Sequence, residues 1–224
     1  MTTLTPVEPF AIEGPGGRLD GRLELPDPAA GAAPRFLAIF GHPHPQHGGT
    51  MQNSVVVHGA RALAALGGAV ARFDFRGVGR SGGRYDEGRG ERADYGAVAA
   101  FLRRRFAASL PLLAAGFSFG AIRALEVAAA GEADAWLGVA PPLTLARYSG
   151  QVPEQVAVRA ALVLAGADEL VAAPSPDELA RRFADLRAVE VVPAAGHLFF
   201  GRIREVAAAV ARAAAALGFA PTAS

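Results

Sequence analysis

The chain has 224 residues, 51% of them hydrophobic, and its formal net charge of +1 gives no basic field that would attract nucleic acid. Its apolar stretches are far too short to span a membrane, and its first residues lack the basic and apolar regions of a signal peptide, so we expect a cytoplasmic protein without membrane or nucleic-acid partners. It contains no cysteine and no lysine, which excludes disulfides, thiolate metal sites, cysteine nucleophiles and Schiff-base chemistry.

Short apolar runs alternate with helical stretches along the chain. The first two predicted strands flank a glycine-rich turn, and the second alternates polar and apolar residues, as a half-exposed antiparallel strand does. The strands are predicted at 7–13, 18–25, 36–40, 69–75, 112–117, 135–140, 161–165 and 188–192. The helices are predicted at 51–66, 91–107, 176–184 and 199–216, and residues 123–128 after the fifth strand are strongly helical in composition.

This alternation predicts one α/β domain over residues 1–224. Its sheet should be mostly parallel with about eight strands, helices on both faces and right-handed crossovers. The connection 141–159 is expected to be irregular, with one short helix at most.

The most informative stretch follows the apolar run at 112–115. It gives Gly116-Phe117-Ser118-Phe119-Gly120 and then enters a helical segment. Strand, sharp turn and helix form the context in which Gly-x-Ser-x-Gly acts as a nucleophile elbow. Both glycines should lie against neighbouring backbone, where a Cβ would clash, and the helix N-terminus favours negative charge at Ser118. A plain strand–helix turn with a capping serine is the alternative.

Polar residues follow several of the predicted parallel strands. Functional groups in such sheets gather at the carboxyl ends of the strands. Ser118, Asp168 and His197 stand at three of these ends, in the order nucleophile, acid and base. A serine hydroxyl needs a histidine to take its proton, and an acid fixes the tautomer of that histidine.

The acid has a rival in the neighbouring residue. Glu169 directly follows Asp168, so either carboxylate is a candidate partner for the base. His197 is the only histidine after the elbow, which makes it the one histidine in the position of a base.

The chain resembles the α/β-hydrolase superfamily over nearly its whole length. Two long motifs resemble small, lidless bacterial hydrolases related to the dienelactone hydrolases. They are His42-Pro43-His44-Pro45-Gln46-His47-Gly48-Gly49-Thr50-Met51-x-Asn53 and Phe73-Asp74-Phe75-Arg76-Gly77-Val78-Gly79-x-Ser81-x-Gly83. The resemblance implies a serine-dependent esterase for small substrates without a cofactor. Ser118 stands where dienelactone hydrolases carry cysteine.

The histidine- and proline-rich loop has a mechanistic use in this family. The tetrahedral intermediate needs two backbone N–H groups aimed at its oxyanion. One should come from Phe119, and the resemblance assigns the other to His44, since Pro43 and Pro45 have no N–H. The alternative for His42, His44 and His47 is a metal site, which the prolines disfavour, and we expect no metal.

The connection 141–159 stands where lids usually grow in this superfamily, and it is too short for a helical cap. Pro142, Leu143 and Tyr148 are predicted to wall a shallow pocket beside Ser118. The sequence therefore predicts a serine esterase for short acyl groups. A thioesterase, a peptide-cleaving relative and a non-catalytic binding protein of the same fold remain alternatives.

Overall fold

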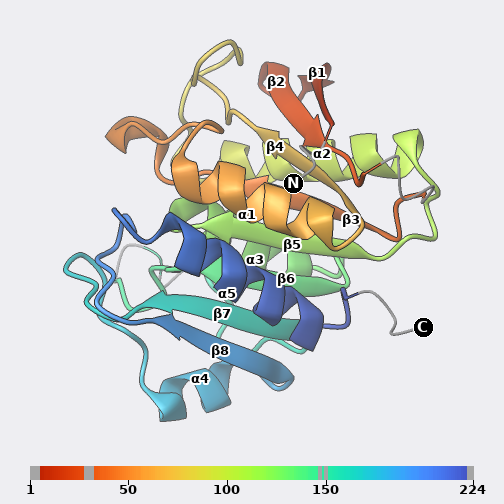
Figure 1. Cartoon of the computed structure of the whole chain (residues 1–224). Helices are drawn as coiled ribbons and strands as arrows, with labels where there is room; N and C mark the ends of the chain where they lie inside the picture. The colour runs from red at the N-terminus through yellow and green to blue at the C-terminus, as the bar shows by residue number, and fades with distance from the viewer. Residues whose placement is uncertain (1–5, 28–32, 146–147, 149–150, 221–224) are drawn as a thin grey trace.

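The structure is a computed structural model that describes residues 6–27, 33–145, 148 and 151–220. Its centre is one sheet of eight strands in the order β1-β2-β4-β3-β5-β6-β7-β8 (Figure 1). The strands are β1 (Val7–Gly14), β2 (Gly17–Glu24), β3 (Phe36–Gly41), β4 (Gly68–Phe73), β5 (Leu112–Phe117), β6 (Ala135–Val139), β7 (Arg159–Ala165) and β8 (Leu186–Val192).

Only β2 runs against the other strands of the sheet. The β1–β2 and β2–β4 pairs are antiparallel, and every later pair, from β4–β3 to β7–β8, is parallel. The alternating sequence of β2 had predicted its antiparallel pairing, whereas the continuous apolar runs belong to strands buried on both faces. The prediction of a mostly parallel sheet of about eight strands is thus confirmed.

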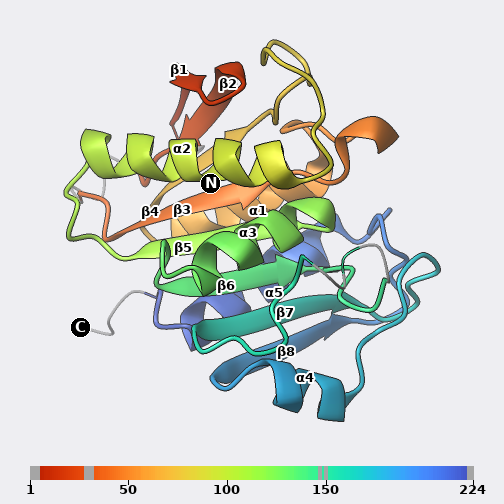
Figure 2. The same cartoon turned by 180° about the vertical axis from the view of Figure 1, so that it is seen from behind.

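Helices cover both faces of the sheet. Helices α1 and α5 lie on the face toward the viewer in Figure 1, and α2 and α3 lie on the face toward the viewer in Figure 2. Helix α4 lies beside the β8 edge. The helices are α1 (Ser54–Ala65), α2 (Arg89–Arg105), α3 (Phe119–Ala129), α4 (Pro176–Arg182) and α5 (Ile203–Ala216), and η2 (Pro45–His47) is a short 3-10 helix. In the described part of the chain, no helix is both long enough and apolar enough to cross a bilayer.

The central strand β5 shows how the sheet divides the core. All six of its residues are buried. Leu112 and Ala114 pack with α2 and α3, whereas Leu113, Ala115 and Phe117 pack with α1 and α5. This two-residue alternation creates a separate hydrophobic cluster on each face.

Two helices start later than their sequences predict. Helix α1 begins at Ser54, not at 51, because the Asn53 side chain accepts a hydrogen bond from the Val55 N–H and caps the helix there. Helix α5 begins at Ile203, not at 199, because Phe199 and Gly201 have φ of 52° and 71°, which no right-handed helix contains.

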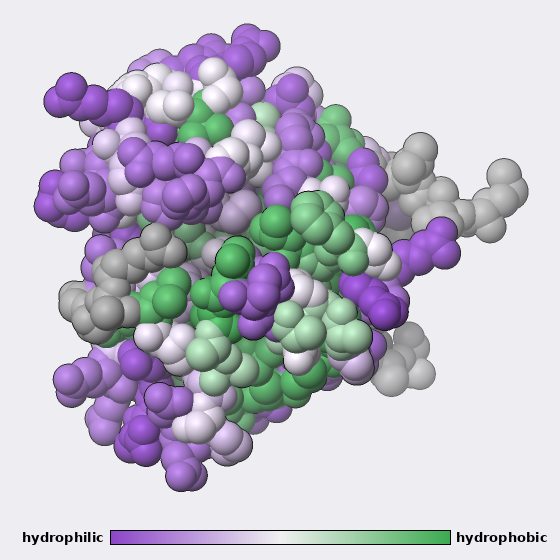
Figure 3. Space-filling view, turned by 90° about the vertical axis from the view of Figure 1, so that its left-hand side faces the viewer, coloured by the Kyte–Doolittle hydropathy of each residue, from purple (hydrophilic) through white to green (hydrophobic). Residues whose placement is uncertain are grey.

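The carboxyl ends of the parallel strands meet at one edge of the sheet. Figure 3 views the molecule from this edge, where hydrophobic side chains gather among hydrophilic ones. The exposed leucines at this edge are Leu170 (59% exposed) and Leu198 (39% exposed), which follow β7 and β8. The fold therefore presents an apolar surface where its functional loops converge.

Candidate active site

Ser118 occupies a sharp turn between β5 and α3. Its backbone has φ 51° and ψ −115°, a conformation that non-glycine residues rarely adopt. The turn is held by a hydrogen bond of 2.8 Å from the Ser118 N–H to the Val139 carbonyl of the neighbouring strand. The predicted elbow is present, and it stores backbone strain at the serine.

The two glycines of the elbow pack as the sequence predicts. A Cβ on Gly116 would lie 2.3 Å from the carbonyl carbon of Gly120, and a Cβ on Gly120 would lie 2.4 Å from the carbonyl carbon of Gly41. Both neighbours are backbone atoms and cannot move aside without displacing a strand or a helix. The predicted clash at both glycines is confirmed.

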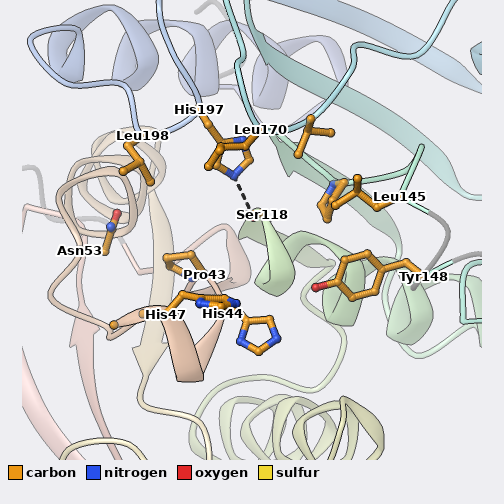
Figure 4. A pocket seen from close by; sticks show the side chains of 14 residues that line it. Pro43, His44, His47, Asn53, Ser118, Leu145, Tyr148, Leu170, His197 and Leu198 are labelled. Carbon is orange, nitrogen blue, oxygen red and sulfur yellow. Dashed lines mark hydrogen bonds between the residues drawn. The ribbon is translucent and has the colours of Figure 1, made fainter.

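The side chains of Ser118, His197 and Asp168 form a continuous line of hydrogen bonds at this edge, and Figure 4 shows the link between Ser118 and His197. The Oγ of Ser118 lies 3.0 Å from Nε2 of His197, and Nδ1 of His197 lies 2.8 Å from Oδ2 of Asp168. An ionised carboxylate can only accept, so Nδ1 carries the proton. The neutral His197 ring therefore presents a lone pair on Nε2 to the Ser118 hydroxyl, as a general base does.

The two rival carboxylates contact different parts of His197. Asp168 contacts the ring through Oδ2, and its Oδ1 accepts the N–H groups of Leu170 and Val171 at 3.0 and 2.8 Å. Glu169 instead accepts the backbone N–H of His197 at 3.1 Å. Asp168 is placed to orient the imidazole, whereas Glu169 holds the loop that carries it.

His42 is a buried brace between two loops. Its Nε2 accepts the N–H of Phe75 at 3.0 Å, so its Nδ1 carries the proton and donates to the Pro43 carbonyl at 2.6 Å. Burial lowers the pKa of His42 to about 4; the hydrogen bond to Pro43 opposes this effect, and the charge of His44 adds to it. His42 therefore stays neutral near pH 7.

This brace fixes the direction of one candidate oxyanion donor. The Pro43 carbonyl points toward the His42 ring, and in a trans peptide the N–H of His44 points to the opposite side. His44 lies against the same cavity as Ser118. The Phe119 N–H is at the first position of α3 and donates to no acceptor within the described residues.

We expect the neutral state of His42 to make stability depend on pH. Above pH 6.5 the ring is neutral in both folded and unfolded chains, and below this value the unfolded chain binds the proton first. The free energy of unfolding should therefore fall by about 3 kcal/mol as the pH drops from 6.5 to about 4. Urea unfolding of the parent and His42→Gln at both pH values measures this, and an equal loss in the non-titrating variant would contradict it.

The histidine loop offers no convergent set of metal ligands within the described residues. No group of three or more histidine, aspartate or glutamate side chains is arranged there to hold an ion. Both nitrogens of His42 are engaged, and His44 and His47 lie with their ring centroids 4.7 Å apart beside the cavity.

A cavity of about 260 Å³ opens beside Ser118 (Figure 4). Pro142 and Tyr148 line it, as predicted, but Leu143 does not: it is buried in the core under α3. Sequence reasoning missed four further lining residues. Two follow the acid (Leu170 and Val171), one follows the base (Leu198) and one caps α1 (Asn53).

The fold and this site define the α/β-hydrolase class. The chain is 35% identical to an α/β serine hydrolase homologue from Coxiella burnetii, with a TM-score of 0.81 over 95% of this chain and 97% of that one. It is 32% identical to an α/β serine hydrolase without a lid from Xanthomonas campestris, with a TM-score of 0.80 over the whole of both chains. The chain belongs to the family of lidless α/β serine hydrolases.

Solved structures with lower sequence identity resemble the chain in fold alone. A dienelactone hydrolase from Anabaena variabilis is 20% identical, with a TM-score of 0.74 over 95% of this chain and 98% of that one. No protein-family model matches the chain.

Proposed function

We propose that the protein is a serine esterase that cleaves small carboxylic esters through an acyl-enzyme, within a single domain. The observation that carries this proposal is the hydrogen-bonded line from Ser118 through His197 to Asp168 beside an apolar cavity. A binding protein would have no need for a strained serine hydrogen-bonded to an oriented histidine.

The chemistry follows from the geometry. The Ser118 oxygen attacks the ester carbonyl carbon while His197 Nε2 takes the hydroxyl proton, and the N–H groups of His44 and Phe119 stabilise the oxyanion. The C–O bond to the alcohol then breaks, and the imidazolium returns the proton to the leaving oxygen. A water molecule repeats both steps on the acyl-enzyme, so that the acid leaves and the serine is restored. No cofactor takes part.

A substrate panel tests this proposal directly. Nitrophenyl esters and matched thioesters of graded chain length should be hydrolysed, and a fluorophosphonate should label Ser118. Faster turnover of thioesters than of esters would identify the alternative thioesterase. Absence of both turnover and labelling would favour a non-catalytic member of the fold.

The pocket predicts a preference for short acyl groups. Its volume of about 260 Å³ lies just below the usual range of ligand sites, and the described part of the 141–159 connection forms no helical cap over it. Butyrate esters should therefore be cleaved faster than palmitate esters, and the rate should rise smoothly through the solubility limit of each. A palmitate preference above about tenfold, or a jump in rate when substrate aggregates, would refute the open-pocket interpretation.

A further inference from the structure

The two ends of the Asn53 side-chain amide, Oδ1 and Nδ2, can play different roles. Its Oδ1 accepts the Val55 N–H at 2.9 Å and caps α1. The same residue lines the cavity that holds Ser118. In Figure 4 it lies near Leu198, on the side of the cavity away from Leu145 and Leu170.

The cap fixes which way the amide faces. A backbone N–H requires an oxygen, so Oδ1 must be the capping atom and Nδ2 must be the other end of the amide. Nδ2 carries two N–H donors, and no described residue accepts a hydrogen bond from either. The helix cap therefore fixes the position of an unused donor on a residue that lines the cavity.

The opposite side of the cavity differs in chemistry. Leu145 and Leu170 lie on that side with the Tyr148 ring (Figure 4), and Pro142 and Val171 add further apolar lining to the cavity. Among the described residues that line the cavity, none is an arginine, aspartate or glutamate. A charged substrate would find no carboxylate or guanidinium partner there, whereas a neutral one with an apolar end and a polar end would match both sides.

We propose that Asn53 is a specificity-determining residue whose Nδ2 donates a hydrogen bond to an oxygen of the substrate. The substrate class is a neutral ester with a short apolar group on one side of the ester bond and an acceptor oxygen on the other. This inference rests on the proposed esterase function. A donor already held by the helix cap loses little entropy when it binds, so it gives selectivity at small cost.

Two pairs of esters isolate the acceptor, each differing by one oxygen in place of one methylene. 2-Methoxyethyl butyrate and n-butyl butyrate place the change in the alcohol, and ethyl 3-methoxypropanoate and ethyl pentanoate place it in the acyl group. The ratio of kcat/KM within a pair, compared between parent and variant, cancels the intrinsic difference between the two esters.

Two variants remove the donor and keep the cap. Asn53→Ser retains a capping oxygen but has no group at the position of Nδ2, and Asn53→Asp places an acceptor oxygen there. Gln52→Ala is the matched control, because Gln52 neighbours Asn53 but its Oε1 accepts from Arg72 and it does not line the cavity. Far-UV circular dichroism checks that each variant folds.

In one of the two pairs, the ratio of kcat/KM for the oxygen-containing ester to kcat/KM for its methylene analogue should be about three- to tenfold higher in the parent than in Asn53→Ser. This is the range expected for a single neutral hydrogen bond. Asn53→Asp should lower the ratio in the same pair at least as far, and Gln52→Ala should not change it. The affected pair identifies which side of the ester faces Asn53. Unchanged ratios in both pairs, with turnover intact, would overturn this inference alone, whereas an inactive parent would overturn the esterase function with it.

Discussion

Replacing Ser118 with alanine should reduce turnover by about 10⁴- to 10⁶-fold, because the variant has no nucleophile and the remaining machinery acts on water alone. The folded state should be nearly unaffected. The Ser118 hydroxyl makes one hydrogen bond, to His197, and alanine keeps the same Cβ at the strained φ of 51°. Initial rates with a nitrophenyl butyrate, together with thermal unfolding of parent and variant, measure the two effects.

Labelling identifies the nucleophile independently of the rate. A fluorophosphonate adduct should map to Ser118 in the parent and disappear in Ser118→Ala. Ser175→Ala is the control, because Ser175 caps α4 and does not line the cavity. Labelling at Ser54, Ser81 or Ser175 would refute the assignment of Ser118.

Replacing Asp168 with asparagine should impair turnover near neutral pH by about 10³- to 10⁴-fold. The asparagine amide can donate to Nδ1 of His197, which stabilises the tautomer with the proton on Nε2. That nitrogen faces Ser118 at 3.0 Å and can then no longer accept the hydroxyl proton. Values of kcat and kcat/KM between pH 6 and 9 test this expectation.

Glu169→Gln is the matched change at the neighbouring carboxylate. Its amide oxygen can still accept the backbone N–H of His197, the contact that Glu169 makes at 3.1 Å. We expect turnover within about tenfold of the parent, because the imidazole keeps its partner and position. A larger loss in Glu169→Gln than in Asp168→Asn would transfer the role of the acid to Glu169.

The local features of the chain were readable from the sequence because they depend on periodicity and backbone sterics. Continuous apolar runs such as Leu112–Phe117 indicated strands buried on both faces, and their alternation with helices fixed a parallel sheet. The spacing of Gly116 and Gly120 around Ser118 indicated the elbow, since only glycine tolerates backbone atoms at 2.3–2.4 Å from a Cβ position.

Contacts between distant segments were decided only by the tertiary structure. Asp168 and Glu169 are adjacent in sequence, and the fold alone directs one to the imidazole and the other to the backbone of His197. Leu143 was predicted to line the pocket, but the chain turns it into the core. Side-chain direction in an irregular connection depends on packing against other elements, which one segment's sequence does not encode.

The contacts of two further residues near the site, His42 and Asn53, could likewise not be predicted from the sequence. His42 was considered only as a possible metal ligand, yet its ring joins Phe75 to Pro43 across 30 or more residues of chain and thereby orients the His44 peptide. Asn53 was part of a sequence motif without a role, and its cap on α1 leaves the amide donor unused on a residue that lines the cavity. Which groups stand at the strand ends could be predicted from the residue pattern alone. The tertiary structure decided which atoms of those groups meet, because hydrogen bonds require ångström-scale positions that only the packed sheet provides.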